Sequence, residues 1–284
     1  MVSDQAINYR NEKTLKMTEI LENEHPIAFQ LFGHDIDHMV SAANYLDEMT
    51  GCDIIDINMG CPVQKVVKTG AGAALMRDVD HATKLVSKII ENVSKPVTVK
   101  MRSGWDDHEL SAIKLAKNLE KVGVSALFVH GRTREQFYSG EADWNIIKEV
   151  KESVSVPVFG NGDITSGVKA KEMMDLTGCD GVMIGRALMK SPWLIKECQM
   201  ALSGEETFEI TMDERLDFTL EHGRRLSRLL GETMAMKQMR SHAAWALKGL
   251  PGSHKIKAQI VQMNSMAEFV RIIDEYKGEL NHDN

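Results

Sequence analysis

The sequence predicts a (β/α)8 TIM barrel that is followed by a small α-helical domain. Short apolar runs alternate with longer amphipathic stretches as far as about residue 208, which is typical of repeated βα units. Nearly every run ends in polar residues or glycine, as expected where barrel strands reach the active-site face. From residue 209 onward the patterns are helical. We therefore predict a barrel domain over residues 1–208 and a helical domain over residues 209–284.

Six apolar runs have the length and composition of buried parallel strands. In chain order they are IAFQLF (27–32), DIIDINM (53–59), PVTVKMR (96–102), ALFVHG (126–131), VPVFGNG (156–162) and DGVMIG (180–185). Between them, apolar residues recur at helical spacing over residues 37–49, 80–93, 109–123, 144–154 and 166–178. The alternation indicates one helix between each pair of strands.

The beginning of the chain supplies fewer strands than a closed barrel requires. Residues 1–3 (MVS) read as the end of one more strand, which still leaves one βα unit of the eight unaccounted for. We therefore expect that the first strand of the barrel is missing from this sequence. Unpaired sheet edges on both sides of the gap would be a cost of that loss.

The C-terminal part predicts helices over residues 212–230, 232–248 and 254–276. Breaks are expected at Gly231 and at Leu250-Pro251-Gly252, because glycine and proline end helices.

Composition excludes several classes of protein. The four cysteines show no CxxC or CxxxC spacing and follow no secretory signal, so neither a disulfide framework nor a structural zinc site is supported. No apolar run approaches the roughly 20 residues that cross a bilayer. We expect a cytoplasmic monomer without a membrane partner, a metal or an obligate protein partner.

The net charge of −7 conceals a basic segment in the predicted helical domain. Between His222 and Lys257, eight basic side chains stand against one acid, Glu232, for a local net charge of +7. The basic residues are Arg224, Arg225, Arg228, Lys237, Arg240, Lys248, Lys255 and Lys257. Such a run is typical either of a solvated helix face or of a surface for a polyanion.

Polar residues at the strand ends are predicted to converge on one mouth of the barrel. They are Gln30, Asn58 with Cys61, Lys100 with Arg102, His130 with Arg132, Asn161 with Gly162 and Asp163, and Gly185 with Arg186. Any one of them alone is typical of ordinary core packing or of a turn. Six polar strand ends in succession indicate a functional site.

Two features of this set predict an anionic cofactor. A buried lysine is costly unless it is paired, so Lys100 is expected to face an anionic or strongly polar group. The glycines of NGDI (161–164) and GRALM (185–189) allow a backbone to approach a phosphate closely, and Arg186 adds charge.

Several segments together closely resemble the tRNA-dihydrouridine synthases, and LKGLPGS (247–253) fits the bacterial branch of that family. The others are NMGCP (58–62), VKMR (99–102), VHGRTREQFYSG (129–140), FGNGDI (159–164) and IGRA (184–187). The resemblance implies an FMN-dependent (β/α)8 barrel with a C-terminal tRNA-binding domain. It also implies reduction of tRNA uridines to 5,6-dihydrouridine by NADPH or NADH through FMN.

The resemblance also implies a role for each strand-end residue. Cys61 would be the general acid that protonates uracil C5 after hydride transfer from flavin N5 to C6. The cofactor-binding residues would be Gln30, Lys100, His130, Asn161, Gly162, Asp163, Gly185 and Arg186. The residues that contact the uridine or the rest of the tRNA would be Asn58, Arg102, Arg132, Arg240 and Lys248.

One departure from the family keeps two other interpretations open. Family members begin with a strand that ends in an Ala-Pro-Met type motif beside FMN, and this sequence has none. We interpret the sequence as a fragment or as one with a misassigned start. The alternatives are a non-catalytic tRNA-binding remnant and another FMN barrel that reduces a free pyrimidine.

Overall fold

The computed structural model describes residues 1–282, which form two compact units. The first comprises Met1–Ile164 and Lys169–Met183, and the second comprises Thr165–Val168 and the residues from Ile184 onward. Their positions relative to one another are not determined. The helices α9 (Ala187–Lys190) and α10 (Leu194–Ser203) group with the later helices. The domain boundary expected at residue 209 stays a prediction.

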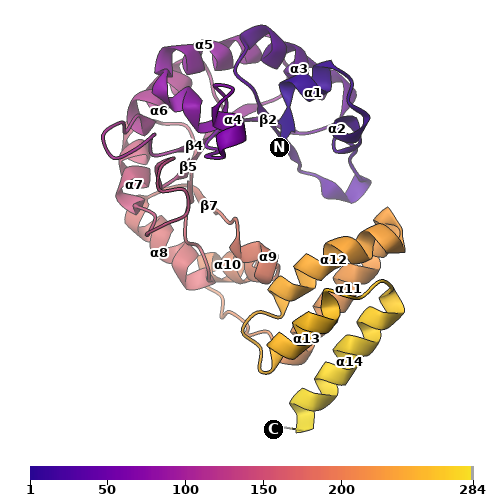
Figure 1. Cartoon of the computed structure of the whole chain (residues 1–284). Helices are drawn as coiled ribbons and strands as arrows, with labels where there is room; N and C mark the ends of the chain where they lie inside the picture. The colour runs from indigo at the N-terminus through magenta and orange to yellow at the C-terminus, as the bar shows by residue number, and fades with distance from the viewer. Residues whose placement is uncertain (283–284) are drawn as a thin grey trace. The chain divides into compact units, whose positions relative to one another are not determined.

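The first unit is built on one parallel sheet whose strands follow each other in chain order (Figure 1). The strands are β1 (Val2–Ser3), β2 (Ala28–Phe32), β3 (Ile54–Met59), β4 (Val97–Arg102), β5 (Ala126–His130), β6 (Val158–Asn161) and β7 (Gly181–Met183). Every run that the sequence marked as a strand forms one, and the opening residues form the short β1. The (β/α)8 barrel class is confirmed, with seven strands among the described residues.

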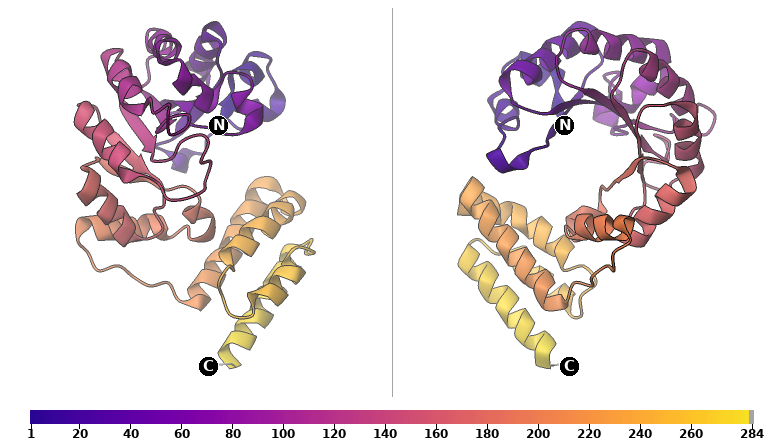
Figure 2. Two further views of the ribbon diagram at one scale, coloured as in Figure 1. Left: turned by 60° about the vertical axis from the view of Figure 1, so that its left-hand side comes forward. Right: turned by 180° about the vertical axis from the view of Figure 1, so that it is seen from behind.

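Helices cover the outer face of the curved sheet (Figure 2). They include α1 (Asp4–Asn8), α3 (Ile36–Met49), α5 (Val79–Ile90), α6 (Ala112–Lys121), α7 (Trp144–Ser153) and α8 (Gly167–Thr177). The connecting segments contain the short helices α2 (Glu12–Lys16) and α4 (Gln64–Val67) and the 3-10 turns η1 (Glu22–Glu24) and η2 (Gly72–Arg77). α5 shows why these segments are helical. Asp78 caps it by accepting from the backbone N–H of His81, and its buried residues recur at helical spacing.

The strands alternate between an apolar and a polar face, which positions the site. Ile55, Ile57 and Met59 of β3 are fully buried, and the residues between them are polar. β4 repeats the pattern over Val97–Arg102. Because side chains alternate along a strand, the apolar set packs under the helices and the polar set lines the inner face of the sheet.

The second unit is helical. Besides α9 and α10 it contains α11 (Met212–Leu230), α12 (Glu232–Ala246), α13 (Ser253–Ile260) and α14 (Met266–His282). α11 begins with a capping box between Thr211 and Glu214. The expected breaks are confirmed, since Gly231 (φ +77°) and Gly252 (φ +62°) separate the helices. The single helix expected over residues 254–276 is wrong, because the chain leaves the helix after Ile260 and begins α14 at Met266. The core that joins α11–α14 includes Leu216, Leu220, Met236, Met239, Ile256, Phe269, Ile273 and Tyr276.

No helix in the described part of the chain combines the length and the apolarity that crossing a bilayer requires.

Candidate active site

The inner face of the sheet brings polar side chains from neighbouring strands into register. Gln30 pairs with Asp56, and Asn58 pairs with Lys100. One level higher, Arg102 stands beside His130, which stands beside Asn161. Paired residues of parallel strands project to the same side. The structure therefore brings the predicted residues of β2–β6 to one surface.

A chain of buried hydrogen bonds runs beneath this surface and ends at Asn58. Gln30 Nε2 donates to Asp56 Oδ2 (2.6 Å), and Gln30 Oε1 accepts from Asn58 Nδ2 (2.6 Å). Asp56 also accepts from the Thr98 hydroxyl at 2.6 Å. Burial raises the pKa of Asp56, although the bonds from Gln30 and Thr98 and the charge of Lys100 oppose that rise.

Sequence reasoning missed Asp56 and Thr98. Both stand two residues before a predicted site residue, Asn58 and Lys100, and so lie on the same face of their strands. That period of two was the signal that could have identified them.

Asn58 in turn shapes the turn that carries Cys61. Its Oδ1 accepts from the backbone N–H of Gly60 (3.2 Å) and of Cys61 (2.9 Å). The Cys61 carbonyl accepts from the N–H of Ala73 in η2 at 3.1 Å. Cys61 is half-buried, whereas the other three cysteines are buried. The sulfur of Cys61 therefore sits at a strand end whose main chain is fixed on both sides.

Gly72 is required for this arrangement. Its φ is +63°, and an added Cβ would lie 2.8 Å from the Cys61 carbonyl oxygen. A side chain at residue 72 would push on the turn that carries the thiol.

The Lys100 side chain lies on the inner face of the sheet and is not paired with an acidic side chain among the described residues. Among the described residues its ammonium has no hydrogen-bond or ion-pair partner. Burial, and then the charge of Arg102, lower the pKa of Lys100 to about 8, while Asp56 acts in the opposite direction. The expectation that Lys100 is buried is met only in part, since its side chain is half-buried. An unpartnered ammonium in this position can hold an anionic group.

His130 is neutral at physiological pH. Burial and the charges of Lys100, Arg102 and Arg132 lower its pKa to about 3. Its Nε2 lies 3.4 Å from Arg132 Nη1, a donor, so the proton is assigned to Nδ1. Gly162 lies against this ring with φ +130°, where an added Cβ would come 3.2 Å from His130 Cδ2.

The guanidinium of Arg102 donates hydrogen bonds to backbone carbonyls of the protein. Its Nε donates to the carbonyl of Gly60 (2.8 Å), and its Nη1 donates to the carbonyls of Thr133 (2.7 Å) and Phe137 (2.9 Å). The guanidinium therefore ties the Cys61 turn to the loop that follows β5. Its predicted contact with the tRNA stays a prediction.

Arg132 is bonded inside the protein as well. It forms a bidentate pair with Asp163, with N···O distances of 2.9 and 2.8 Å, and only 2% of its side chain is exposed. It also donates to the carbonyls of Ser139 and Gly140. The pair joins the loop after β5 to the loop after β6. The predicted roles of Arg132 and Asp163 toward substrate and cofactor stay predictions.

The predicted phosphate-binding residues are divided between the two units. Asn161 and Gly162 end β6 in the first unit, where Asn161 Nδ2 donates to the Met183 carbonyl at 2.7 Å. Gly185 and Arg186 are exposed residues of the second unit. A shared phosphate site stays a prediction.

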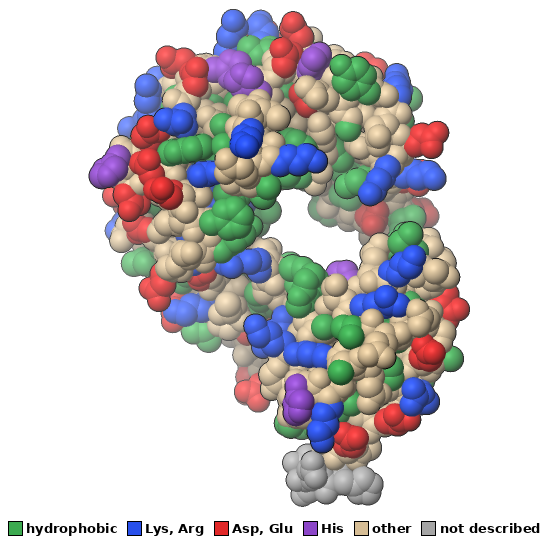
Figure 3. Space-filling view, viewed as in Figure 1, with side chains coloured by type: hydrophobic (Ala, Val, Ile, Leu, Met, Phe, Trp, Pro, Cys, Tyr) green, Lys and Arg blue, Asp and Glu red, His purple; other side chains and the backbone are tan. Residues whose placement is uncertain are grey.

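The predicted tRNA contacts of the second unit differ in their surroundings. Arg240 donates to the Met263 carbonyl and to Asn264 Oδ1, while Lys248 is exposed and has no side-chain partner among the described residues. Figure 3 shows Lys and Arg side chains beside hydrophobic ones on the visible face of this unit.

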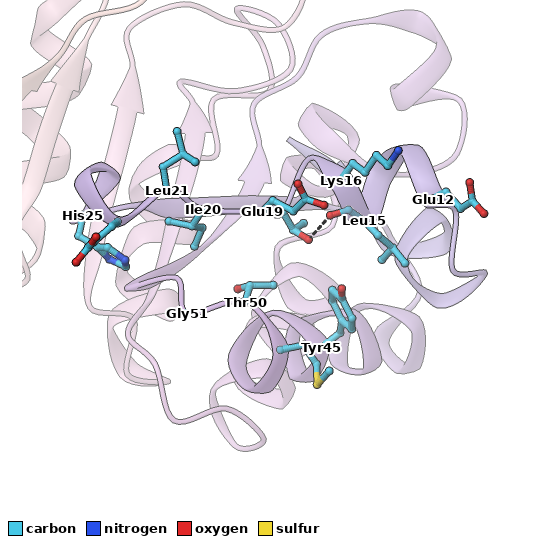
Figure 4. A pocket seen from close by; sticks show the side chains of 13 residues that line it. Glu12, Leu15, Lys16, Glu19, Ile20, Leu21, His25, Tyr45, Thr50 and Gly51 are labelled. Carbon is cyan, nitrogen blue, oxygen red and sulfur yellow. Dashed lines mark hydrogen bonds between the residues drawn. The ribbon is translucent and has the colours of Figure 1, made fainter. Parts of the chain in front are cut away.

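A large cavity lies away from this site. It measures about 610 Å³ and lies between α2 and the end of α3, with His25 and Gly51 among its lining residues (Figure 4). These two residues precede β2 and β3, so the cavity is at the opposite end of the strands from Cys61. Barrel enzymes carry out their chemistry at the C-terminal ends of the strands, and three glutamates line this cavity. It does not suit an anionic cofactor.

Comparison with known proteins matches this chain to one family. The family model described as "Dihydrouridine synthase (Dus)" matches residues 1–281. A "Probable tRNA-dihydrouridine synthase" of Rickettsia conorii is 42% identical over 266 residues, which are 93% of this chain and 80% of that protein. A protein of the same description from Rickettsia bellii is 40% identical, over 100% of this chain and 87% of its own length. The "tRNA-dihydrouridine synthase B" of Pseudomonas putida is 39% identical, over 88% of this chain and 74% of its own length.

Proposed function

The chain belongs to the dihydrouridine synthase family, and we propose that it is an enzyme that reduces uridines of tRNA to 5,6-dihydrouridine. We further propose FMN as its cofactor and NADPH or NADH as its reductant. The observation that supports the chemistry best is the Cys61 turn, because hydrogen bonds with Asn58 and η2 hold a half-buried thiol at the active-site end of the barrel.

The residues of the inner face fit a planar anionic cofactor. Lys100 offers an unpartnered ammonium, and its neighbour on β3, Asn58, is hydrogen-bonded to Gln30. When bound, FMN would supply the hydride for uracil C6. Lys100 would stabilise negative charge on the reduced flavin ring, and Gln30 would contact the same ring.

Cys61 would supply the proton. Its Sγ–H would donate to uracil C5, opposite the face that receives the hydride, so that the two additions saturate the 5,6 double bond. Asn58 keeps the thiol in place through the amides of Gly60 and Cys61. The neutral imidazole of His130 adds no positive charge that would compete with Lys100 for the cofactor.

The helical unit would hold the rest of the tRNA. The segment from His222 to Lys257 carries a net charge of +7, which suits a phosphate backbone and gives salt-dependent binding. The target uridine must leave the stacked tRNA structure to reach a strand end, as in other enzymes that act on bases. Arg240 and Lys248 are proposed as tRNA contacts on this surface.

The test is the visible absorption of the purified protein, before and after FMN, NADPH and undermodified tRNA are added in turn. We expect flavin bands that bleach with NADPH and return with tRNA, together with dihydrouridine in the recovered tRNA. Reoxidation by free uracil or orotate but not by tRNA would instead support a dehydrogenase of free pyrimidines. A colourless protein that still binds tRNA would support a non-catalytic binder.

A further inference from the structure

A second pocket lies within the helical unit, between the α9–α10 turn and the helices α11 and α12. It measures about 240 Å³, and Trp193, Phe218, His222 and His242 contribute four aromatic rings to a mainly apolar lining. Sites for drug-sized ligands have volumes of roughly 300–1,000 Å³. The α11–α12 pocket therefore matches one planar ring system better than a flavin or a dinucleotide.

The rings in and beside this pocket meet edge to face. The centroids of Trp193 and Phe218 are 5.8 Å apart with planes at 81°, and those of His222 and His242 are 5.1 Å apart at 65°. His242 meets Trp245 in the same way, at 5.5 Å and 85°. None of these pairs is stacked face to face within the described residues. The Arg215 guanidinium lies over the Trp193 ring, 5.9 Å from its centroid, whereas Phe218 is 43% exposed. Phe218 is therefore the ring that a further planar group can best reach.

The two histidines have polar groups without partners. Neither His222 nor His242 makes a hydrogen bond or ion pair with any described residue, and both are half-buried. Burial, and then the proximity of His242, lower the pKa of His222. A neutral imidazole has one donor and one acceptor, which an apolar ligand would leave unsatisfied. The pocket therefore suits a ring with a hydrogen-bonding edge.

The pocket includes exposed residues, and two lysines stand close in sequence to residues that line it. Phe218 and Met189 are each 43% exposed. Lys190 and Lys248 are exposed and have no side-chain partner among the described residues. Lys190 follows the lining residue Met189, and Lys248 is two residues beyond the lining residue Ala246. An added Cβ at Gly249 would lie 3.9 Å from Lys190 Nζ, so the Lys190 ammonium lies close to the backbone that follows Lys248. Phosphates on either side of a bound ring would meet these charges.

We propose that the α11–α12 pocket binds one unstacked base of tRNA, at a nucleotide other than the uridine that is reduced. The proposal rests on the proposed function, because tRNA is the substrate that brings such a base. Phe218 provides the stacking surface, Trp193 packs against Phe218, and the two histidines contact the base edge. A second anchored nucleotide would fix the orientation of the tRNA and so help to determine which uridine reaches Cys61.

The experiment compares Phe218→Ala with Leu229→Ala, a control on the same helix whose side chain is 59% exposed and outside the pocket. We expect Phe218→Ala to weaken binding of undermodified tRNA about tenfold or more at fixed salt, and Leu229→Ala to change it less than twofold. Bleaching of the flavin by NADPH should be unchanged in both variants, and thermal melts should show that both fold. In wild-type protein, the imidazole NMR signals of His222 and His242 should shift on addition of tRNA.

The outcomes of this experiment distinguish a failure of the pocket proposal from a failure of the proposed function. If wild-type protein forms dihydrouridine while Phe218→Ala binds tRNA with wild-type affinity, the pocket proposal is wrong and the activity stands. An equal loss in both variants would also contradict the pocket, since the effect would not be specific to it. If wild-type protein neither binds nor modifies tRNA, the proposed function fails and the pocket proposal fails with it.

Discussion

Two arginines of the barrel and two of the helical unit have opposite surroundings. Arg102 and Arg132 in the barrel are each 2% exposed, and their guanidinium groups are bonded to carbonyls and to a carboxylate. In the helical unit, Arg225 and Arg228 are 75% and 69% exposed and share the single carboxylate of Glu221. The buried arginines therefore join loops of the candidate active site. The exposed arginines leave positive charge that a polyanion can contact. Burial, rather than the count of charges, distinguishes the two uses.

Removing the thiol tests whether chemistry is confined to the barrel. We expect Cys61→Ala to lower the rate of dihydrouridine formation by about 10²–10⁴-fold, the range for loss of a general acid. The affinity for tRNA should stay within twofold of wild type, because the basic surface is untouched. Single-turnover oxidation of the prereduced enzyme by tRNA measures the rate, and a filter-binding titration measures the affinity. A loss of affinity equal to the loss of rate would contradict this division of roles.

Removing a buried arginine tests the structural half of the comparison. Arg132→Met removes the cation that is paired with the Asp163 carboxylate, so we expect the free energy of unfolding to fall by about 3 kcal/mol. The lower end of the usual range is expected because Asp163 is 35% exposed. Urea denaturation measures the change.

Arg225→Met is the matched control, since it removes the same group from an exposed pair. Its free energy of unfolding should change by no more than about 0.5 kcal/mol. Equal losses of free energy of unfolding in Arg132→Met and Arg225→Met would contradict the proposed difference between buried and exposed arginines.

Exposed charges should instead set the salt dependence of tRNA binding. We expect Arg225→Gln with Arg228→Gln to reduce the slope of log Kd against log salt by about 0.7–0.9 for each tRNA phosphate that the double variant no longer neutralises. The rate of flavin reduction by NADPH should not change. Titrations at several salt concentrations provide the slope. An unaltered slope would place the tRNA on another surface.

The smallest expected effect concerns the charge of Lys100. Because its pKa in the folded protein is about 8, FMN affinity should weaken as the pH rises through 8 and the ammonium is deprotonated. The free energy of unfolding should change in the opposite direction and increase with pH. The unfolded chain holds the proton up to the ordinary lysine pKa of 10.5, so the free energy of unfolding should rise between about pH 8 and pH 10.5.

Fluorescence titrations of FMN from pH 6.5 to 9.5 measure the affinity. Lys100→Met should bind FMN more weakly and without this pH dependence. The same pH dependence in the variant would assign the titration to another group.

The fold was largely predictable from the sequence because each signal was local. Runs such as residues 53–59 and 96–102 show apolar residues bounded by turn residues, and they form strands of nearly those bounds. The helix breaks at Gly231 and Gly252 were equally local. The convergence of strand ends on one face then followed from the barrel class.

The internal bonds of the site were not predictable, because they depend on tertiary distances. Nothing in the sequence near Arg102 shows that its guanidinium reaches the carbonyls of Thr133 and Phe137, about thirty residues away. The pocket lined by Phe218 and His242 was missed for the same reason. The residues stand on helices whose basic side chains dominated the pattern, and only the packing of α9, α11 and α12 brings the rings together.

The order of the strands has a consequence for how the protein is made. Since the sheet order is the chain order, each strand among the described residues pairs with a strand roughly 20–40 residues away. The barrel unit can therefore assemble progressively as the chain leaves the ribosome. The chain from Gln30 through Asp56 and Asn58 to the Cys61 turn needs only β2, β3 and β4. These hydrogen bonds can therefore form before the basic segment from His222 to Lys257 has been synthesised.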